Sequence, residues 1–251
     1  MTPILTSLAL AAEPAALAET HPFLDVSVLA ASLGDLCAGA PVETDRSGEF
    51  ADGACEGFLD TDAAILTVSW TAGVGALDNA ATVDVETAQA RDLALAEKLG
   101  FDPVEYGDVY TGEIIAEDEK DGLTSARSSL GTLTVIERSV DGLWVPAQRI
   151  AITRDPAGAL VDITARWPAF TDATVVADRA KPLDREGYAA ALGVDGSEFL
   201  RARAVLVPGA ISGGAIEDAV VAEAVTFQVA GPDGSLARVG VYLVDGVPVK
   251  E

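Results

Sequence analysis

Residues 132–167 read TLTVIERSVDGLWVPAQRIAITRDPAGALVDITARW, and this stretch decides the fold class. Asp141-Gly142 separates two runs of β-prone residues, and such a pair readily takes the positive φ angles of a tight hairpin turn. Residues 155–158, Asp-Pro-Ala-Gly, carry a second turn signal, because proline fixes φ at the second position and glycine accepts a left-handed conformation at the fourth.

Apolar and polar side chains alternate on both sides of this second turn. The apolar set is Ile150, Ile152, Val161, Ile163, Ala165 and Trp167, and the polar set between them is Arg149, Thr153, Asp162, Thr164 and Arg166. A period of two means that one face of a strand is buried and the other is wet. The stretch therefore predicts a three-stranded antiparallel meander whose apolar face needs a helix or a second layer to cover it.

Helices are predicted on both sides of the meander. Asp84 can cap a helix over 85–99, with Ala88, Leu95 and Leu99 on one face, Lys98 in the last turn and Gly100 as a left-handed stop. Further helices are expected over 20–36 and 183–193, the second beginning at Asp184. Ser197 is expected to cap another helical turn through Phe199 and Leu200.

Extended segments are predicted elsewhere. Residues 63–70 place Ala64, Leu66, Val68 and Trp70 on one side of a strand, and 101–122 carry one or two strands that lead into an acidic turn. Residues 224–249 read as a hairpin around Gly231-Pro232-Asp233-Gly234, with a second Asp-Gly signal at 245–246.

The order of these elements predicts an α+β fold in which antiparallel β-meanders pack against helices. The strings SVDGLWVP and LVDGVPV suggest two similar units in tandem, with a boundary in 168–182, while a single large domain is the alternative. The expected regions are an N-terminal helical and disulfide-loop region over 1–62, an α+β unit with the meander over 63–170, and a smaller α+β unit over 171–251.

The meander resembles the PepSY and FTP-type modules of metalloprotease propeptides and bacterial envelope proteins. The matching residues are Asp141, Gly142, Val145, Pro146, Ile150, Ile152, Asp155, Gly158 and Trp167, within 132–167, with a fainter match over 225–249. The resemblance implies a noncatalytic module outside the cytoplasm that inhibits, escorts or docks onto another protein. This chain departs from a protease precursor, since its sequence has no zinc-binding His-Glu-x-x-His helix.

Charge narrows the range of partners. Sixteen Lys and Arg against forty Asp and Glu leave a formal charge of −24, a field that repels phosphate backbones and anionic lipid surfaces. We therefore expect no nucleic-acid partner and no membrane insertion, since no apolar run reaches ~18 residues. The partner is expected to be another protein, or a second copy of this chain.

Cys37 and Cys55 are expected to form a disulfide, with two buried free thiols as the alternative. A disulfide fits an extracytoplasmic or secreted protein, although a cytoplasmic location stays open. The first twenty residues contain an apolar run without a preceding Lys or Arg, interrupted at Glu13-Pro14. Both an amphipathic helix and a poor signal peptide fit this run, and we favour the helix.

The sequence shows no catalytic constellation, and we expect no enzyme activity and no cofactor. His21 is the single histidine, Asp78 replaces the third glycine of a dinucleotide-binding pattern, and Ala210 replaces the first glycine of a serine-hydrolase elbow at Ser212. Trp70, Trp144 and Trp167 are expected to be core or sheet-face residues.

One set of residues has the spacing of a calcium-binding loop. Asp45, Ser47, Glu49 and Glu56 are spaced as in an EF-hand loop, but Phe50 stands where the sharp turn needs glycine, so a solvated acidic loop beside the disulfide is favoured over a calcium site.

We expect a noncatalytic protein-binding or assembly module. The alternatives are a structural subunit of a virion, shell or surface layer that assembles through sheet edges, and a carboxylate-based hydrolase.

Overall fold

The computed structural model describes Ser32 and residues 36–37, 47–52, 55–70, 84–120, 123–171, 174–177, 183–192, 198–230, 236–244 and 247–249. The fold is dominated by one twelve-stranded mixed sheet with strand order β1-β2-β3-β7-β6-β9-β12-β13-β14. β4 pairs with β5, β5 also pairs with β6, and β8 pairs with β12. β10 (Ile211–Ser212) and β11 (Ala215–Ile216) form a separate small hairpin.

The predicted meander is confirmed in its turns and its register. β5 (Leu123–Val140), β6 (Leu143–Arg154) and β7 (Leu160–Arg166) are consecutive antiparallel neighbours. Asp141 and Gly142 have φ angles of 51° and 76°, which suit the tight hairpin turn, and Gly158 has a φ angle of 83°. Ile150, Ile152 and Ile163 are fully buried, so the alternation correctly identifies the core face.

The helix predicted from residue 84 is also confirmed. α2 (Val85–Lys98) begins at Asp84, whose carboxylate accepts hydrogen bonds from the backbone N–H groups of Glu86 and Thr87. Gly100, with φ 96°, follows its end. Leu95, Ala96 and Leu99 share the core with Ile136, Ile150, Ile152, Ile163 and Trp167. The 3₁₀ helix η2 (Pro103–Glu105) then leads into β4 (Tyr106–Lys120), a single long strand.

β1 (Ser47–Asp52), β2 (Cys55–Asp60) and β3 (Ile65–Trp70) extend the sheet beyond β7. Ala64, Leu66 and Val68 are buried as predicted. The predicted helix over 20–36 lies almost wholly outside the described residues, of which Ser32 and Leu36 are helical.

The second half contains β8 (Val175–Ala177), α3 (Arg185–Leu192), β9 (Glu198–Pro208), β12 (Asp218–Ala230), β13 (Leu236–Val244) and β14 (Val247–Val249). The hairpin predicted over 224–249 is confirmed by the β12–β13 and β13–β14 pairs. The helical turn predicted at Ser197 is wrong, because Phe199 and Leu200 belong to β9, and Phe199 opposite Phe227 satisfies its backbone within the sheet.

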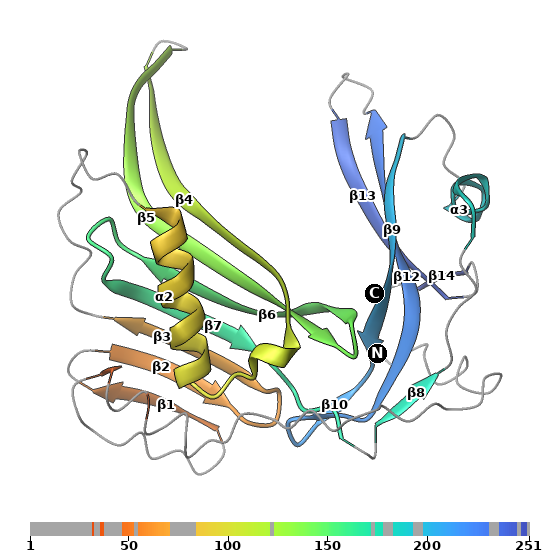
Figure 1. The fold of residues 1–251 in the computed structure, drawn as a ribbon, viewed down its shortest axis with the longest axis horizontal. Coiled ribbons are helices and arrows are strands. Elements are labelled where there is room, and N and C mark those ends of the chain that lie inside the picture. Colours follow the sequence, from red (N-terminus) through yellow and green to blue (C-terminus); the bar gives the residue numbers. More distant parts are fainter. Residues whose placement is uncertain are drawn as a thin grey trace.

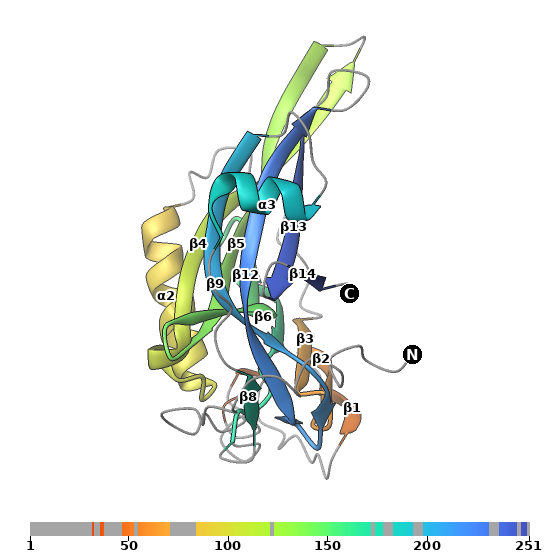
Figure 2. The same cartoon turned by 90° about the vertical axis from the view of Figure 1, so that its right-hand side faces the viewer.

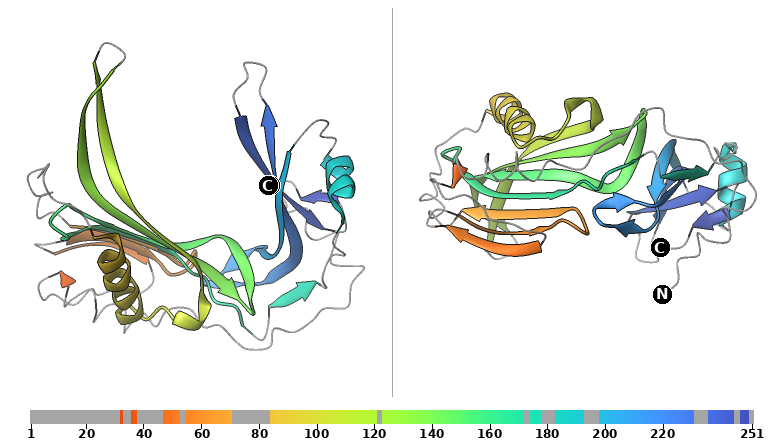
Figure 3. Two further views of the ribbon diagram at one scale, coloured as in Figure 1. Left: turned by 45° about the horizontal axis from the view of Figure 1, so that its top comes forward. Right: turned by 90° about the horizontal axis from the view of Figure 1, so that it is seen from below.

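The predicted α+β class is wrong. α2 and α3 each cover a limited patch, while long strands join laterally into a large mixed sheet that satisfies most of the backbone polar groups. Figure 1 shows the result as two arms, the β4–β5 hairpin and the β12–β13 hairpin, which extend to the same side of the molecule. The arms are also separate in the tilted view of Figure 3.

The two halves of the sheet meet at one parallel bridge between Trp144 of β6 and Val205 of β9. A cluster that includes Val140, Val145, Phe170 and Leu206 is buried at this junction. β2 and β3 lie on either side of the predicted boundary at residue 62, and they are paired neighbours in the same sheet. The division into three regions at 62 and 170 stays a prediction.

α3 covers only the outer face of the second half. Tyr188 of α3 packs with Val225, Phe227 and Leu243, and Figure 2 shows the helix in front of β9, β12 and β13, on the side away from the β4–β5 arm. Because side chains alternate along these strands, Ala224, Thr226 and Tyr242 face inward, toward the other arm.

Candidate functional site

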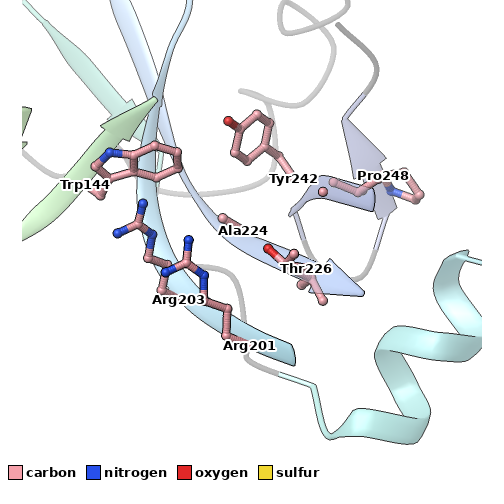
Figure 4. Close-up of a pocket in the computed structure, with 10 residues that line it drawn as sticks. Trp144, Arg201, Arg203, Ala224, Thr226, Tyr242 and Pro248 are labelled. Carbon is pink, nitrogen blue, oxygen red and sulfur yellow. The ribbon is translucent and has the colours of Figure 1, made fainter. Parts of the chain in front are cut away.

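A pocket of about 610 Å³ lies on this inner face, next to the junction of the two halves. We call it the inner pocket. Its lining residues are Trp144, Arg201, Arg203, Ala224, Val225, Thr226, Gly240, Val241, Tyr242 and Pro248. In Figure 4 the two arginines and Trp144 lie on one side of the pocket, and Tyr242 and Pro248 lie on the other. Its volume is within the range of about 300–1,000 Å³ typical of ligand sites.

The strand register builds the pocket from cross-strand rows. Arg203 of β9, Ala224 of β12 and Tyr242 of β13 form one row. Arg201, Thr226 and Gly240 form the next. Since residues two apart on a strand share a face, all six belong to the inner face.

Small residues in the middle of these rows make the surface hollow. Ala224 is flanked by Arg203 and Tyr242, and Gly240 has no side chain at all. A Cβ added at Gly240 would meet no heavy atom within 4 Å, so the space above this glycine is open. The pocket is therefore a consequence of small residues between large ones on a continuous sheet.

Arg203, which belongs to the second half of the sheet, is anchored by three residues of the first half. Its guanidinium lies 3.0 Å from Asp108 of β4 and 3.6 Å from Glu137 of β5, and its Cζ lies 3.8 Å from the centroid of the Trp144 ring. Asp108 also accepts a hydrogen bond from the Tyr110 hydroxyl at 3.1 Å. Partial burial, this hydrogen bond and the charge of Glu137 raise the pKa of Tyr110, while Arg203 opposes the rise.

Arg201 is placed differently. Its side chain is exposed and makes no ion pair with any residue of the described ranges. The Nε1 of Trp144 is buried and has no hydrogen-bond partner within the same ranges. The inner pocket thus offers one exposed cation, Arg201, that no described residue pairs with, while the Trp144 N–H is enclosed by the fold.

Two buried ion pairs lie away from the pocket, under α2 and η2. The fully buried Arg138 donates from Nε to Glu105 at 2.6 Å, and Trp167 donates to the same Glu105 oxygen at 2.9 Å. Arg138 also donates to Gln148 and to the carbonyl of Pro168. Burial lowers the pKa of Arg138 to about 10, with Glu105 opposing the shift.

The second buried pair joins α2 to the meander. Arg154 donates from Nε to Asp92 of α2 at 2.5 Å and from its Nη1 to the carbonyl of Gly158 at 3.0 Å. The Thr134 hydroxyl donates to the other Asp92 oxygen at 2.6 Å. The carboxylates of Asp92 and Glu105 thus accept hydrogen bonds from within the fold, and the two ion pairs hold helix and sheet together.

The expected disulfide is present in the structure. Cys37 and Cys55 are joined, with their Cα atoms 5.4 Å apart, and their exposed fractions are 1% and 2%. The bond ties the chain before the sheet to β2.

The calcium candidates fall on a hairpin. Asp45 lies outside the described residues, Ser47 and Glu49 belong to β1, and the exposed Glu56 belongs to β2. The register pairs Glu49 with Phe58 and Ala51 with Glu56. Within the described ranges no three His, Cys, Asp or Glu side chains gather as metal ligands would.

The remaining motifs are placed as follows. His21 and the glycine pattern that ends at Asp78 lie outside the described residues, while Ser212 is exposed on the short strand β10. Trp167 is buried as expected, but Trp144 is only half-buried and lines the inner pocket. No helix in the described part of the chain combines the length and apolarity needed to cross a bilayer.

Sequence reasoning missed Arg201, Arg203 and Tyr242. A usable signal was present in 201–205, Arg-Ala-Arg-Ala-Val, where two cations alternate with alanines. That alternation places both cations on one face of a strand, in a chain whose cations are few. Pairing with Thr226, Gly240 and Tyr242 could not be read from it, because register between distant strands is a tertiary property.

Comparisons with known proteins give little further information. No family model matches the chain, and no curated protein matches it. Among solved structures, the chain is similar to the Bacillus megaterium YpeB C-terminal domain, with a TM-score of 0.40 and 8% identity over 91% of this chain and 97% of that one. A TM-score this low assigns neither fold nor function, and the PepSY/FTP resemblance stays a prediction.

Proposed function

We propose that this chain is a noncatalytic module that acts outside the cytoplasm and binds a partner protein in the inner pocket. The observation that carries the proposal is the pocket itself. It is a preformed hollow with aromatic and cationic walls at the junction of the two halves, and it holds an exposed arginine, Arg201, that pairs with no described carboxylate. Sites of this kind are common where two structural units meet.

The walls have the composition of a protein-binding surface. Trp, Tyr and Arg are the residues most enriched at binding hot spots. Here Trp144, Tyr242 and the two arginines surround one hollow. Arg203 is already held by Asp108 and Glu137 and stacks on the ring of Trp144, so that little side-chain entropy remains to be lost on binding.

The proposed location rests on the disulfide. Disulfides persist in oxidising compartments and are rare where thiols are kept reduced. The Cys37–Cys55 bond is buried, which protects it from exchange with small thiols.

Photo-crosslinking tests the proposed function. A benzophenone amino acid replaces Thr226 in the pocket, and in a control protein it replaces the exposed Ala190 on α3. We expect discrete protein adducts from position 226 in cell-envelope and secreted fractions, reduced in the Tyr242→Ala background and absent from position 190. The captured partner should keep its intact mass. Equal adducts from both positions, or a partner that is cleaved, would contradict the proposal.

A second candidate, a self-assembling structural subunit, is favoured by the free edge of β4. This strand has fifteen residues and, among the described strands, pairs only with β5. Long unpaired edges are templates for strand addition. Light scattering over a hundredfold range of protein concentration distinguishes this candidate, because an assembling subunit gains mass with concentration and a free-standing module does not.

A further inference from the structure

We infer that the inner pocket recognises a carboxylate side chain and an aromatic or apolar side chain two positions away, within an extended segment of the partner protein. The inference rests on the function proposed above. It assigns the carboxylate to Arg201, and the side chain two positions away to the hollow between Ala224, Tyr242 and Pro248, because residues two apart share one side of an extended segment.

The local charge of the pocket is the first argument. Two guanidinium groups reach it, and the carboxylates of Asp108 and Glu137, which lie next to it among the described side chains, both contact Arg203. Arg201 is left without an ion pair among the described residues. A planar guanidinium binds a carboxylate through two parallel N–H donors, which gives both energy and orientation.

The charge of the whole chain supplies selectivity. At a net charge of −24, an acidic segment is repelled by most of the surface, and the pocket is a cationic exception. A basic segment would be attracted to the surface in general, but in the pocket it would meet Arg201 and Arg203. Specific sites commonly combine such local attraction with repulsion elsewhere.

The rest of the pocket fits a peptide. Gly240 leaves open space next to Thr226, so a side chain can enter between the rows, and the ring of Tyr242 lies across from the arginines. An extended segment presents alternate side chains on one side at regular intervals, so its carboxylate can reach Arg201 while a second side chain enters the hollow.

The test uses three fluorescent nonapeptide libraries and fluorescence polarisation with the whole chain. Each library has randomised flanks around two fixed positions that are two residues apart. The first position is Asp or Glu, the corresponding amide, or Lys, and the second position is Phe or Tyr in every library. Phenylacetate serves as a small carboxylate competitor. We expect the acidic library to bind at least tenfold more tightly than the amide library and the Lys library to bind most weakly.

Two charge-matched variants complete the design. Arg201→Glu should weaken the acidic library at least tenfold and make the Lys library the preferred one. Arg185→Glu, an equal change of charge at an exposed position on α3, should alter all affinities less than twofold. Thermal unfolding and circular dichroism of both variants should match the wild type, because both side chains are exposed.

The outcomes separate the inference from the function on which it rests. Three results would overturn the inference. The acidic and amide libraries could bind equally, or Arg201→Glu could leave the library preference unchanged. Phenylacetate could also compete at the concentrations at which the peptides themselves saturate the protein, which would mean that no extended segment is needed. If no library binds but position 226 still captures a partner, the carboxylate assignment fails and the binding function stands. If position 226 captures nothing while the acidic library binds, the carboxylate assignment is supported and the proposed binding of a partner protein is rejected.

Discussion

Arg203 of β9 stacks on the ring of Trp144 of β6, with 3.8 Å between the guanidinium carbon and the ring centroid. The two residues come from the two halves of the sheet, which bridge at Trp144 and Val205. Cation–π contacts of this kind contribute about 0.5–2 kcal/mol. The pair therefore links the shape of the inner pocket to the relative position of the halves.

Trp144→Ala should loosen this junction. We expect a loss of about 1–3 kcal/mol in unfolding free energy, from the lost stacking and packing, and faster amide hydrogen exchange in β9 around Val205. Trp144→Phe is the control, since it keeps a ring beneath the guanidinium. Unchanged exchange in β9 of the alanine variant would show that the stack does not hold the junction.

Glu105→Gln should be strongly destabilising. It leaves the fully buried Arg138 without its carboxylate partner, and breaking one side of a buried ion pair costs about 3–5 kcal/mol. Urea unfolding measures the change, and Glu113→Gln on the exposed side of β4 should stay within about 0.5 kcal/mol of the wild type. Replacing both partners, as in Glu105→Leu with Arg138→Met, should restore part of the loss. A double variant no better than Glu105→Gln would argue against an isolated-charge penalty.

Gly131→Ala should prevent or badly weaken folding. Gly131 has a φ angle of 122°, and a Cβ there would overlap the backbone carbonyl of Arg154 on the neighbouring strand. The strain and overlap together should exceed about 3 kcal/mol. Gly112→Ala on the adjacent strand is the matched control, because its Cβ would meet nothing within 4 Å. Similar unfolding midpoints for the two variants would contradict this reading of the backbone.

Tyr106 should make stability fall at high pH. Burial, with smaller contributions from Glu97 and Asp102, raises the pKa of its phenol above the ordinary value of 10. Below about pH 10 the phenol is protonated in both states, so its contribution is fully present. Above pH 10 the unfolded chain releases the proton while the folded chain retains it, and the contribution is lost as the pH rises toward the folded pKa.

Tyr106→Phe isolates this effect, because it removes the ionisable hydroxyl and keeps the ring. Urea unfolding between pH 8 and pH 11 should show a smaller fall in the phenylalanine variant than in the wild type. Identical pH slopes would rule out a raised Tyr106 pKa.

The Cys37–Cys55 bond should contribute about 3 kcal/mol, since it closes a loop with a sequence separation of 18 residues. The double variant Cys37→Ser with Cys55→Ser should lose this amount in unfolding free energy. Dithiothreitol present during urea unfolding should destabilise the wild type, because the bond becomes accessible in the unfolded chain, and it should leave the double variant unchanged. Alkylation without reductant, followed by mass spectrometry, checks the bond directly, and two labelled thiols would contradict it.

Local patterns predicted the first half of the chain well. The turns at Asp141-Gly142 and at 155–158, the helix capped by Asp84 and the buried face of the meander depend on neighbours a few residues apart. The extent of the sheet was not predictable in this way, and neither was the strand at Phe199 and Leu200, because pairing with β12 outweighed a weak helix-cap signal.

The amino-acid sequence by itself determined which segments turn, which faces are apolar, which two cysteines are available to pair and how acidic the surface is. These properties follow from side-chain volume, backbone φ preference and charge, all of which are local. Only the tertiary structure decided that the strands join one mixed sheet and that Trp144 lies against Arg203, fifty-nine positions further along the chain. Strand register between distant segments is selected by the packing of the whole core, so the inner pocket forms only when the strands between Trp144 and Pro248 are brought together by folding.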